Sequence, residues 1–243
     1  MKMTIGVMGS VSNNTQEASE LAYKLGCAIA NNDCITVTGA CPGLPYDSVM
    51  GAKDNGGMTV GVSPGHNFAE HTIRYNSPHY GFDILVYTGS GLMGREITGV
   101  RTCDMVAIVG GRSGTLGEFA IAYDEGKIIG VLKGTGGISD AIEALIPVIN
   151  KDTGAVVLYN DDPEKLVVEM VELSIARRLS RANRSHTDAQ AVKEDVQFND
   201  MSSVEEAISS IENEIALLQE SITAHKEELK NYKNLKEFGH TDG

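Results

Sequence analysis

The sequence predicts an α/β fold in which helices cover both faces of a doubly wound, mostly parallel sheet. Three observations lead to this prediction. Short apolar runs alternate with helical patterns from the first residues to about residue 178. Most of these runs are continuously apolar, as in strands buried on both faces, and glycines gather directly after them. This alternation indicates a Rossmann-like sheet, in which ligands bind at the carboxyl ends of the strands.

Each expected element follows from a local pattern. Seven short runs have the length and apolar character of strands: Thr4–Met8, Ile35–Thr38, Thr59–Val62, Asp83–Tyr87, Met105–Val109, Ile128–Leu132 and Ala155–Leu158. Longer segments between them carry apolar residues at helical spacing: Thr15–Asn31, Tyr46–Asn55, Leu116–Gly126, Ile138–Ile149 and Pro163–Arg178. The stretch Pro64–Gly81 is long for a connection, which suggests a lid or a subunit contact.

Length and charge narrow the class of protein. A chain of 243 residues accommodates one full domain and an appendage, and 42% hydrophobic residues supply a core. The formal charge of −13 disfavours binding to nucleic acid or to an anionic membrane. The sequence shows neither a signal-peptide pattern nor an apolar run long enough for a membrane span. Because the four cysteines form no C-x-x-C pair, a reducing, cytoplasmic location is expected, without zinc or disulfides.

The pattern changes near residue 180. We therefore expect a globular domain over residues 1–180, a polar linker over 181–201 and a helix over 202–238. Apolar residues recur at spacings of four and three from Val204 to Tyr232, which is typical of a coiled coil and predicts a homo-oligomer. An amphipathic helix folded back on the domain would show a similar pattern.

Two glycine loops are the main candidates for a functional site, ahead of the turns Thr38–Gly43 and Gly9–Ser10, which follow the second and first strands and fit ordinary βα turns. The first, Gly110–Glu118, follows an apolar strand and opens a helix, so its backbone N–H groups suit a phosphate. The second, Thr88–Glu96, places Arg95 beside another glycine turn. The same residues also fit plain βα turns, with Glu118 favouring the helix dipole and Arg95 forming a surface ion pair. His66, His71 and His79 match no zinc spacing and are expected to be loop residues.

These loops together resemble the SLOG superfamily, and within it the LONELY GUY proteins, over about residues 3–160. The strings that carry the resemblance are TGACPG, VMGAKDNGGMTVGVSPG and GGRSGTLGE. The resemblance implies catalytic roles for Arg95 and Glu118. It also implies a phosphate or nucleotide site formed by Gly9, Ser10, Thr38, Gly39, Gly89, Gly111, Arg112, Ser113, Gly114 and Thr115.

The family's reaction, by the same resemblance, is hydrolysis of a nucleoside 5′-monophosphate to free base and ribose 5-phosphate, with no metal or redox cofactor. Three departures separate this chain from the family pattern: Gly110 replaces a proline, Arg112 a glycine and Glu96 a lysine. Three functions follow as hypotheses. The chain is a phosphoribohydrolase, a module that binds a nucleotide or nucleotide-like cofactor without turnover, or an oligomeric scaffold built on its C-terminal helix.

Overall fold

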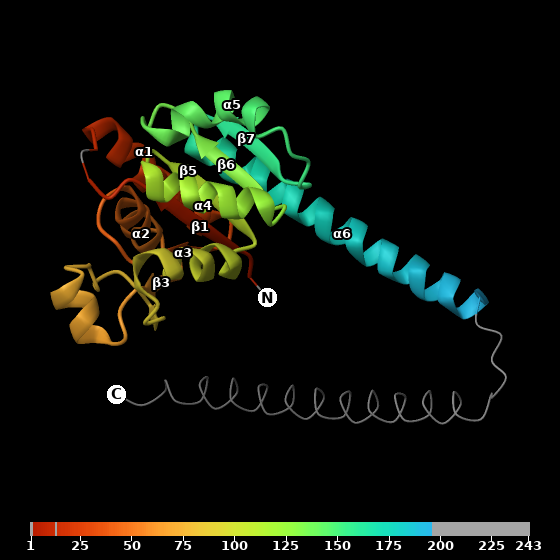
Figure 1. Ribbon diagram of the computed structural model, residues 1–243, viewed down its shortest axis with the longest axis horizontal. Helices are drawn as coiled ribbons and strands as arrows, with labels where there is room; N and C mark the ends of the chain where they lie inside the picture. The colour runs from red at the N-terminus through yellow and green to blue at the C-terminus, as the bar shows by residue number, and fades with distance from the viewer. Residues whose placement is uncertain (1, 13, 196–243) are drawn as a thin grey trace, which may run out of the picture. The chain divides into compact units, whose positions relative to one another are not determined.

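The computed structural model describes residues 2–12 and 14–195, with side chains described as far as residue 180 (Figure 1). Within these residues, seven parallel strands form one sheet in the order β4-β3-β2-β1-β5-β6-β7. The strands are β1 (Thr4–Gly9), β2 (Ile35–Thr38), β3 (Thr59–Ser63), β4 (Ile84–Tyr87), β5 (Met105–Val109), β6 (Ile128–Leu132) and β7 (Val156–Asn160). The predicted parallel sheet and its seven strands are confirmed.

The order of the strands reverses direction at β1. Val7 of β1 pairs with Thr38 of β2 on one side and with Ala107 of β5 on the other. Because the chain builds outward from β1 in both directions, the loops that follow β1 and β5 diverge. This divergence opens a crevice at the carboxyl edge of the sheet, the place where ligands bind in doubly wound folds.

In the described part of the chain, six α-helices accompany the strands: α1 (Gln16–Asn31), α2 (Leu44–Asp54), α3 (Gly91–Thr102), α4 (Ser113–Asp124), α5 (Ile138–Ile149) and α6 (Pro163–Asp195). A short π-helix, η1 (Glu70–Arg74), lies in the long connection after β3. None of the helices, as far as the chain is described, is long and apolar enough to cross a membrane.

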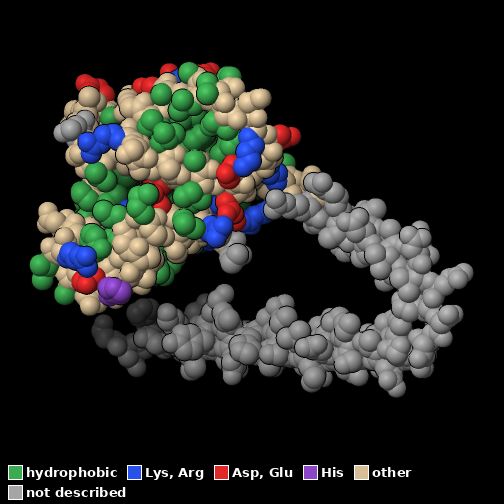
Figure 2. All heavy atoms as spheres, in the orientation of Figure 1, with side chains coloured by type: hydrophobic (Ala, Val, Ile, Leu, Met, Phe, Trp, Pro, Cys, Tyr) green, Lys and Arg blue, Asp and Glu red, His purple; other side chains and the backbone are tan. Residues whose placement is uncertain are grey.

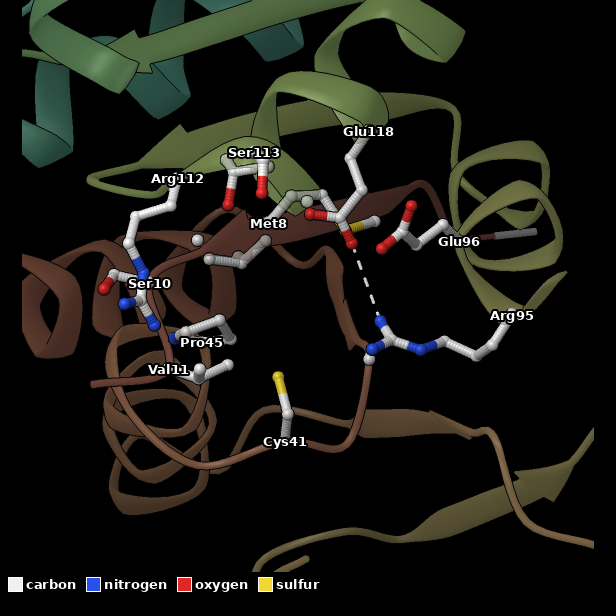
Figure 3. Close-up of a pocket in the computed structure, with 15 residues that line it drawn as sticks. Met8, Ser10, Val11, Cys41, Pro45, Arg95, Glu96, Arg112, Ser113 and Glu118 are labelled. Carbon is white, nitrogen blue, oxygen red and sulfur yellow. Dashed lines mark ion pairs between the residues drawn. The ribbon is translucent and has the colours of Figure 1, made fainter. Parts of the chain in front are cut away.

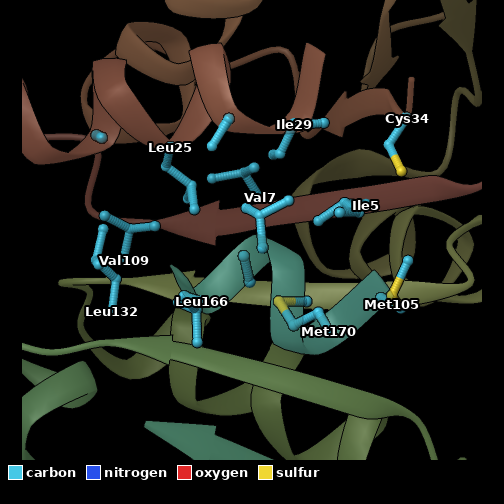
Figure 4. Packing of buried hydrophobic residues seen from close by; sticks show 14 of the residues in the cluster. Ile5, Val7, Leu25, Ile29, Cys34, Met105, Val109, Leu132, Leu166 and Met170 are labelled. Carbon is cyan, nitrogen blue, oxygen red and sulfur yellow. The ribbon is translucent and has the colours of Figure 1, made fainter. Parts of the chain in front are cut away.

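Two apolar cores, one on each face of the sheet, hold these layers together. The first joins Ile5 and Val7 of β1 to Leu25 of α1 and to Leu166 and Met170 of α6 (Figure 4). The second joins residues of β5 and β6 to α3, α4 and α5, and it includes Val106, Ile108, Val100, Phe119 and Ile142. Side chains along β5 alternate between the two cores, as the twofold period of a strand requires, and all of them are buried.

The structure differs from the sequence prediction at several element bounds and at His71, which was expected to be a loop residue but is buried on η1. Residues 91–102 form the helix α3, whereas Thr88–Glu96 were expected to be a loop. Helix α4 begins at Ser113, three residues before the predicted start at Leu116. Helix α6 continues to Asp195 and therefore includes residues 181–195 of the range expected as a linker. The predicted C-terminal helix, residues 202–238, lies outside the described residues.

Candidate functional site

A pocket of about 310 Å³ lies at the crevice between β1 and β5, and we call it the switch-point pocket (Figure 3). Its walls come from five parts of the chain: the end of β1 with the turn after it, the turn after β2, the start of α2, helix α3 and the start of α4. The residues that line it are Val7, Met8, Gly9, Ser10, Val11, Gly39, Cys41, Pro45, Arg95, Glu96, Arg112, Ser113, Gly114, Thr115 and Glu118.

The first turn of α4 presents free backbone donors to this pocket. Leu116 is the first residue of the helix whose N–H bonds to a helical carbonyl, that of Arg112, at 2.9 Å. The N–H groups of Ser113, Gly114 and Thr115 therefore have no acceptor within the helix. Such a helix start combines free donors with the positive end of the helix dipole, and it favours an anion.

The tight turn before α4 depends on Gly110 and Gly111. Both have positive φ, 60° and 102°, a conformation that side chains other than glycine rarely adopt. The carbonyl of Gly111 accepts a hydrogen bond from Ile138 N–H at 3.0 Å, which anchors the turn to the start of α5. An added Cβ at Gly111 would overlap the side chain of Thr115. Gly111 therefore shapes the helix start without lining the pocket.

Arg95 and Glu118 form an ion pair inside the pocket. Nη1 of Arg95 lies 3.5 Å from Oε1 of Glu118, and the two side chains are only 9% and 8% exposed. The guanidinium packs against Gly39, where an added Cβ would overlap Nη1. Nε of Arg95 is buried and has no hydrogen-bond partner among the described residues. An unsatisfied buried donor of this kind marks a place for a ligand acceptor or a water.

Burial controls the protonation of the acidic groups in this pocket. Desolvation raises the pKa of the Glu118 carboxyl to about 7; the Arg95 guanidinium opposes this rise, and the charge on Glu96 adds to it. Burial also raises the pKa of Glu96, against the effect of Arg95. It raises the pKa of the Cys41 thiol to about 11, so this thiol stays protonated at neutral pH.

Arg112 stands at the other end of the pocket from the ion pair (Figure 3). Its side chain is exposed, and Nη2 donates to Oγ of Ser12 at 3.0 Å. None of the ion pairs among the described residues includes Arg112, so its charge is available to a ligand.

Most of the predicted site residues come together in the switch-point pocket. Three do not line it: Thr38, Gly89 and Gly111. Thr38 is buried, and its hydroxyl accepts a hydrogen bond from Ala40 N–H at 3.1 Å, which stabilises the turn after β2. Gly89 packs against His66 and bonds to the carbonyl of Gly65 at 3.0 Å.

The sequence analysis did not predict several of the residues that line the switch-point pocket. Val11 and Pro45 reach the pocket because the carbonyl of Ser10 accepts a hydrogen bond from Leu44 N–H at 2.9 Å, which draws the start of α2 against the β1 turn. Glu96 follows the predicted Arg95, and Cys41 lies two residues after the predicted Gly39. The sequence does not show where these two side chains point, so only the structure shows that they line the pocket. Among the residues that the structure describes, no three His, Cys, Asp or Glu side chains converge as metal ligands do.

Fold and pocket together define a Rossmann-like protein with a ligand crevice at its topological switch point. The chain belongs to the SLOG cluster4 family, whose model matches residues 2–167, so the resemblance to the SLOG superfamily is confirmed. An uncharacterized protein from Archaeoglobus fulgidus is 31% identical over 136 residues, which cover 54% of this chain and 80% of that protein.

Two solved structures are similar over almost their whole length. The molybdenum cofactor binding protein from Rippkaea orientalis has a TM-score of 0.57 and 27% identity, covering 72% of this chain and 98% of that one. The Moco carrier protein from Chlamydomonas reinhardtii has a TM-score of 0.60 and 26% identity, covering 73% of this chain and 99% of that one.

Proposed function

We propose that the switch-point pocket binds a small phosphorylated heterocycle, either a nucleotide or a nucleotide-like cofactor, and holds it without chemical change. The observation that carries this proposal is the free first turn of α4 beside the Arg112 guanidinium. Backbone N–H groups donate hydrogen bonds to phosphate oxygens, and an arginine guanidinium can donate two parallel hydrogen bonds to two oxygens of one phosphate. Arg112 replaces a glycine of the family pattern, which adds a side-chain cation to a site normally built from backbone.

The size and chemistry of the pocket fit such a ligand. Its volume of about 310 Å³ lies at the lower end of the range for small-molecule sites. The Arg95 guanidinium adds a second cation to the pocket wall, beside Glu118. The similarity to a molybdenum cofactor binding protein supports the same class of ligand, because the molybdenum cofactor is itself a phosphorylated pterin. A metal in such a ligand would be bound as part of the ligand and would not be a resident cofactor of this protein.

Direct binding measurements test this proposal. The full chain is titrated by calorimetry with a panel of nucleoside monophosphates and with the molybdenum cofactor, and we expect at least one ligand to bind at a single site. Arg112→Gln should weaken that binding by about tenfold, the effect of losing one charge-assisted contact. Arg101→Gln is the matched control, since Arg101 pairs with the exposed Glu125 and lies outside the pocket. Failure of every ligand to bind would reject the proposal.

A second candidate function rests on Glu118. Its carboxyl lies inside the pocket next to Arg95, where it would stabilise the ribosyl cation formed as the bond between base and sugar breaks. Arg95 would then hold the phosphate or offset charge on the departing base. This is the phosphoribohydrolase activity that the family resemblance implies.

Incubation with nucleoside monophosphates, followed by chromatography for free base, tests the second candidate. If the chain is a hydrolase, Glu118→Gln removes nearly all turnover and leaves nucleotide affinity within a few-fold, because the charge acts mainly on the transition state. If the wild-type chain binds a monophosphate and releases no base from any member of the panel, the hydrolase candidate is rejected and the binding function stands.

A further inference from the structure

The two ends of the switch-point pocket differ in charge. Arg112, Ser10 and Ser113 lie at one end, whereas the carboxyls of Glu96 and Glu118 lie at the other (Figure 3). Arg95 already pairs with Glu118 at the acidic end. If the phosphate lies at the Arg112 end, between this guanidinium and the N–H of Ser113, the rest of the ligand extends along the first turn of α4 toward the carboxylates. That half of the ligand must therefore carry hydrogen-bond donors.

Glu96 is the carboxylate available to meet those donors. It lies on α3 with its side chain half-buried against the first turn of α4. Its Oε1 and Oε2 lie 3.4 Å and 3.6 Å from the positions that added Cβ atoms would take at Gly114 and Gly117. The glycines thus leave room for the carboxylate beside the helix. No hydrogen bond or ion pair among the described residues occupies either oxygen of Glu96.

An unpaired carboxylate in this position costs free energy unless a ligand satisfies it. Burial removes water from Glu96 and raises its pKa, and Arg95, which already pairs with Glu118, opposes this rise only in part. A ligand edge with two adjacent N–H donors would bind both oxygens of a carboxylate in parallel, as an arginine fork does. Such an edge is present in the 2-amino-4-oxopyrimidine ring, which guanine and pterins share. Adenine, cytosine and uracil lack it.

We propose that Glu96 is a specificity-determining residue, which selects phosphorylated ligands whose heterocycle carries the 2-amino-4-oxopyrimidine edge. This inference rests on the proposed binding function and narrows its ligand class to guanine nucleotides and pterin phosphates. Glu96 stands where the family pattern has a lysine, and a lysine at this position would repel the same N–H edge. The substitution therefore changes which heterocycle the pocket prefers.

A ligand series that differs one group at a time tests the proposal. GMP, IMP, AMP and a pterin monophosphate are titrated by calorimetry into the full chain. IMP keeps the ring N–H of GMP and lacks the 2-amino group, whereas AMP lacks both donors of this edge. We expect GMP or the pterin phosphate to bind about tenfold more tightly than AMP, with IMP between them, since a bidentate contact of this kind discriminates on that order. Whichever of GMP and the pterin monophosphate binds more tightly identifies the heterocycle that the pocket prefers.

The variant Glu96→Gln assigns the preference to one side chain. Glutamine keeps the size of glutamate but replaces one acceptor with a donor, so the preference over AMP should disappear while AMP affinity stays within a few-fold. Glu172→Gln is the matched control, because Glu172 is exposed on α6 and lies outside the pocket. A preference that survives in Glu96→Gln would overturn the assignment. Equal binding of GMP, the pterin phosphate and AMP would overturn the selectivity and leave the binding function intact, whereas no binding at all would reject both.

Discussion

At the scale of single residues, Glu118 links the stability of this protein to pH. Its folded pKa of about 7 lies above the usual 4.5, so the folded state holds this proton more tightly than the unfolded state does. This tighter proton binding contributes to the free energy of unfolding. The contribution is fully present below pH 4.5 and is lost as the pH rises to about 7. Above that pH the carboxylate remains buried with only Arg95 to offset its charge.

Glu118→Gln should remove this pH dependence. Relative to the wild type, the free energy of unfolding of the variant should rise by on the order of 3 kcal/mol as the pH goes from 4.5 to about 7. Urea unfolding of both proteins at several pH values in this window measures the difference. Glu172→Gln, at an exposed position, should follow the wild-type curve. Parallel curves for Glu118→Gln and the wild type would contradict the prediction.

Gly39 determines where the Arg95 guanidinium lies. Because an added Cβ would overlap Nη1 of Arg95, Gly39→Ala should push the guanidinium away from Glu118. We expect a loss of about 2 kcal/mol in the free energy of unfolding, as for other overpacked sites, together with weaker ligand binding. Thermal unfolding and calorimetry measure the two effects. If Gly39→Ala had wild-type stability and affinity, the tight contact would have no energetic role.

At the scale of elements, helix α3 shows how tertiary packing overrides local propensity. Gly91, Gly94 and Gly99 lower its helical propensity, which is why the sequence pattern suggested a loop there. The helix is held by Val100, which is fully buried in the second core, and by the buried Arg95. These contacts involve strands distant in sequence, so no local pattern reveals them.

Two glycine-to-alanine substitutions separate the effect of helix propensity on stability from the effect of side-chain packing. At Gly99 an added Cβ would meet only Cε of Met8 at 3.9 Å, an ordinary contact, so Gly99→Ala should stabilise the fold by about 1 kcal/mol. At Gly26 the same atom would overlap the carbonyl oxygen of Ser48, where α1 and α2 cross. Gly26→Ala should therefore destabilise the fold by about 3 kcal/mol. Chemical denaturation measures the free energy of unfolding of both variants. Equal changes in Gly99→Ala and Gly26→Ala would contradict the packing argument.

At the scale of the whole molecule, the exposed apolar surface and the C-terminal heptads raise the question of assembly. Ile73, Tyr80, Leu92 and Met93 are 81%, 72%, 56% and 76% exposed. Figure 2 shows apolar side chains on the face formed by α3 and the connection after β3. The heptad pattern beyond residue 202 predicts a second association element, because a lone helix with such an apolar stripe is unstable in water.

We expect a homo-oligomer whose C-terminal helices meet. Light scattering on the full chain and on a chain ending near Arg181 measures the contribution of this segment, and the full chain should contain more subunits. Ile215→Asp in the full chain should lower the subunit number in the same way, because it places a charge at a predicted core position. Equal subunit numbers in all three proteins would show that the helix does not drive assembly.

The sequence by itself determined the class of fold, because continuous apolar runs, helical spacing and glycine-rich strand ends are local patterns. It also located the β5–α4 turn and named Arg95 and Glu118 as candidate site residues, and both line the pocket. Only the tertiary structure decided that Glu96 and Cys41 line the same pocket, that Thr38, Gly89 and Gly111 do not line it, and that Arg95 rests against Gly39. The reason is physical: a pocket is formed where strands and helices far apart in sequence meet, and the direction of each side chain depends on packing across the sheet rather than on its neighbours along the chain.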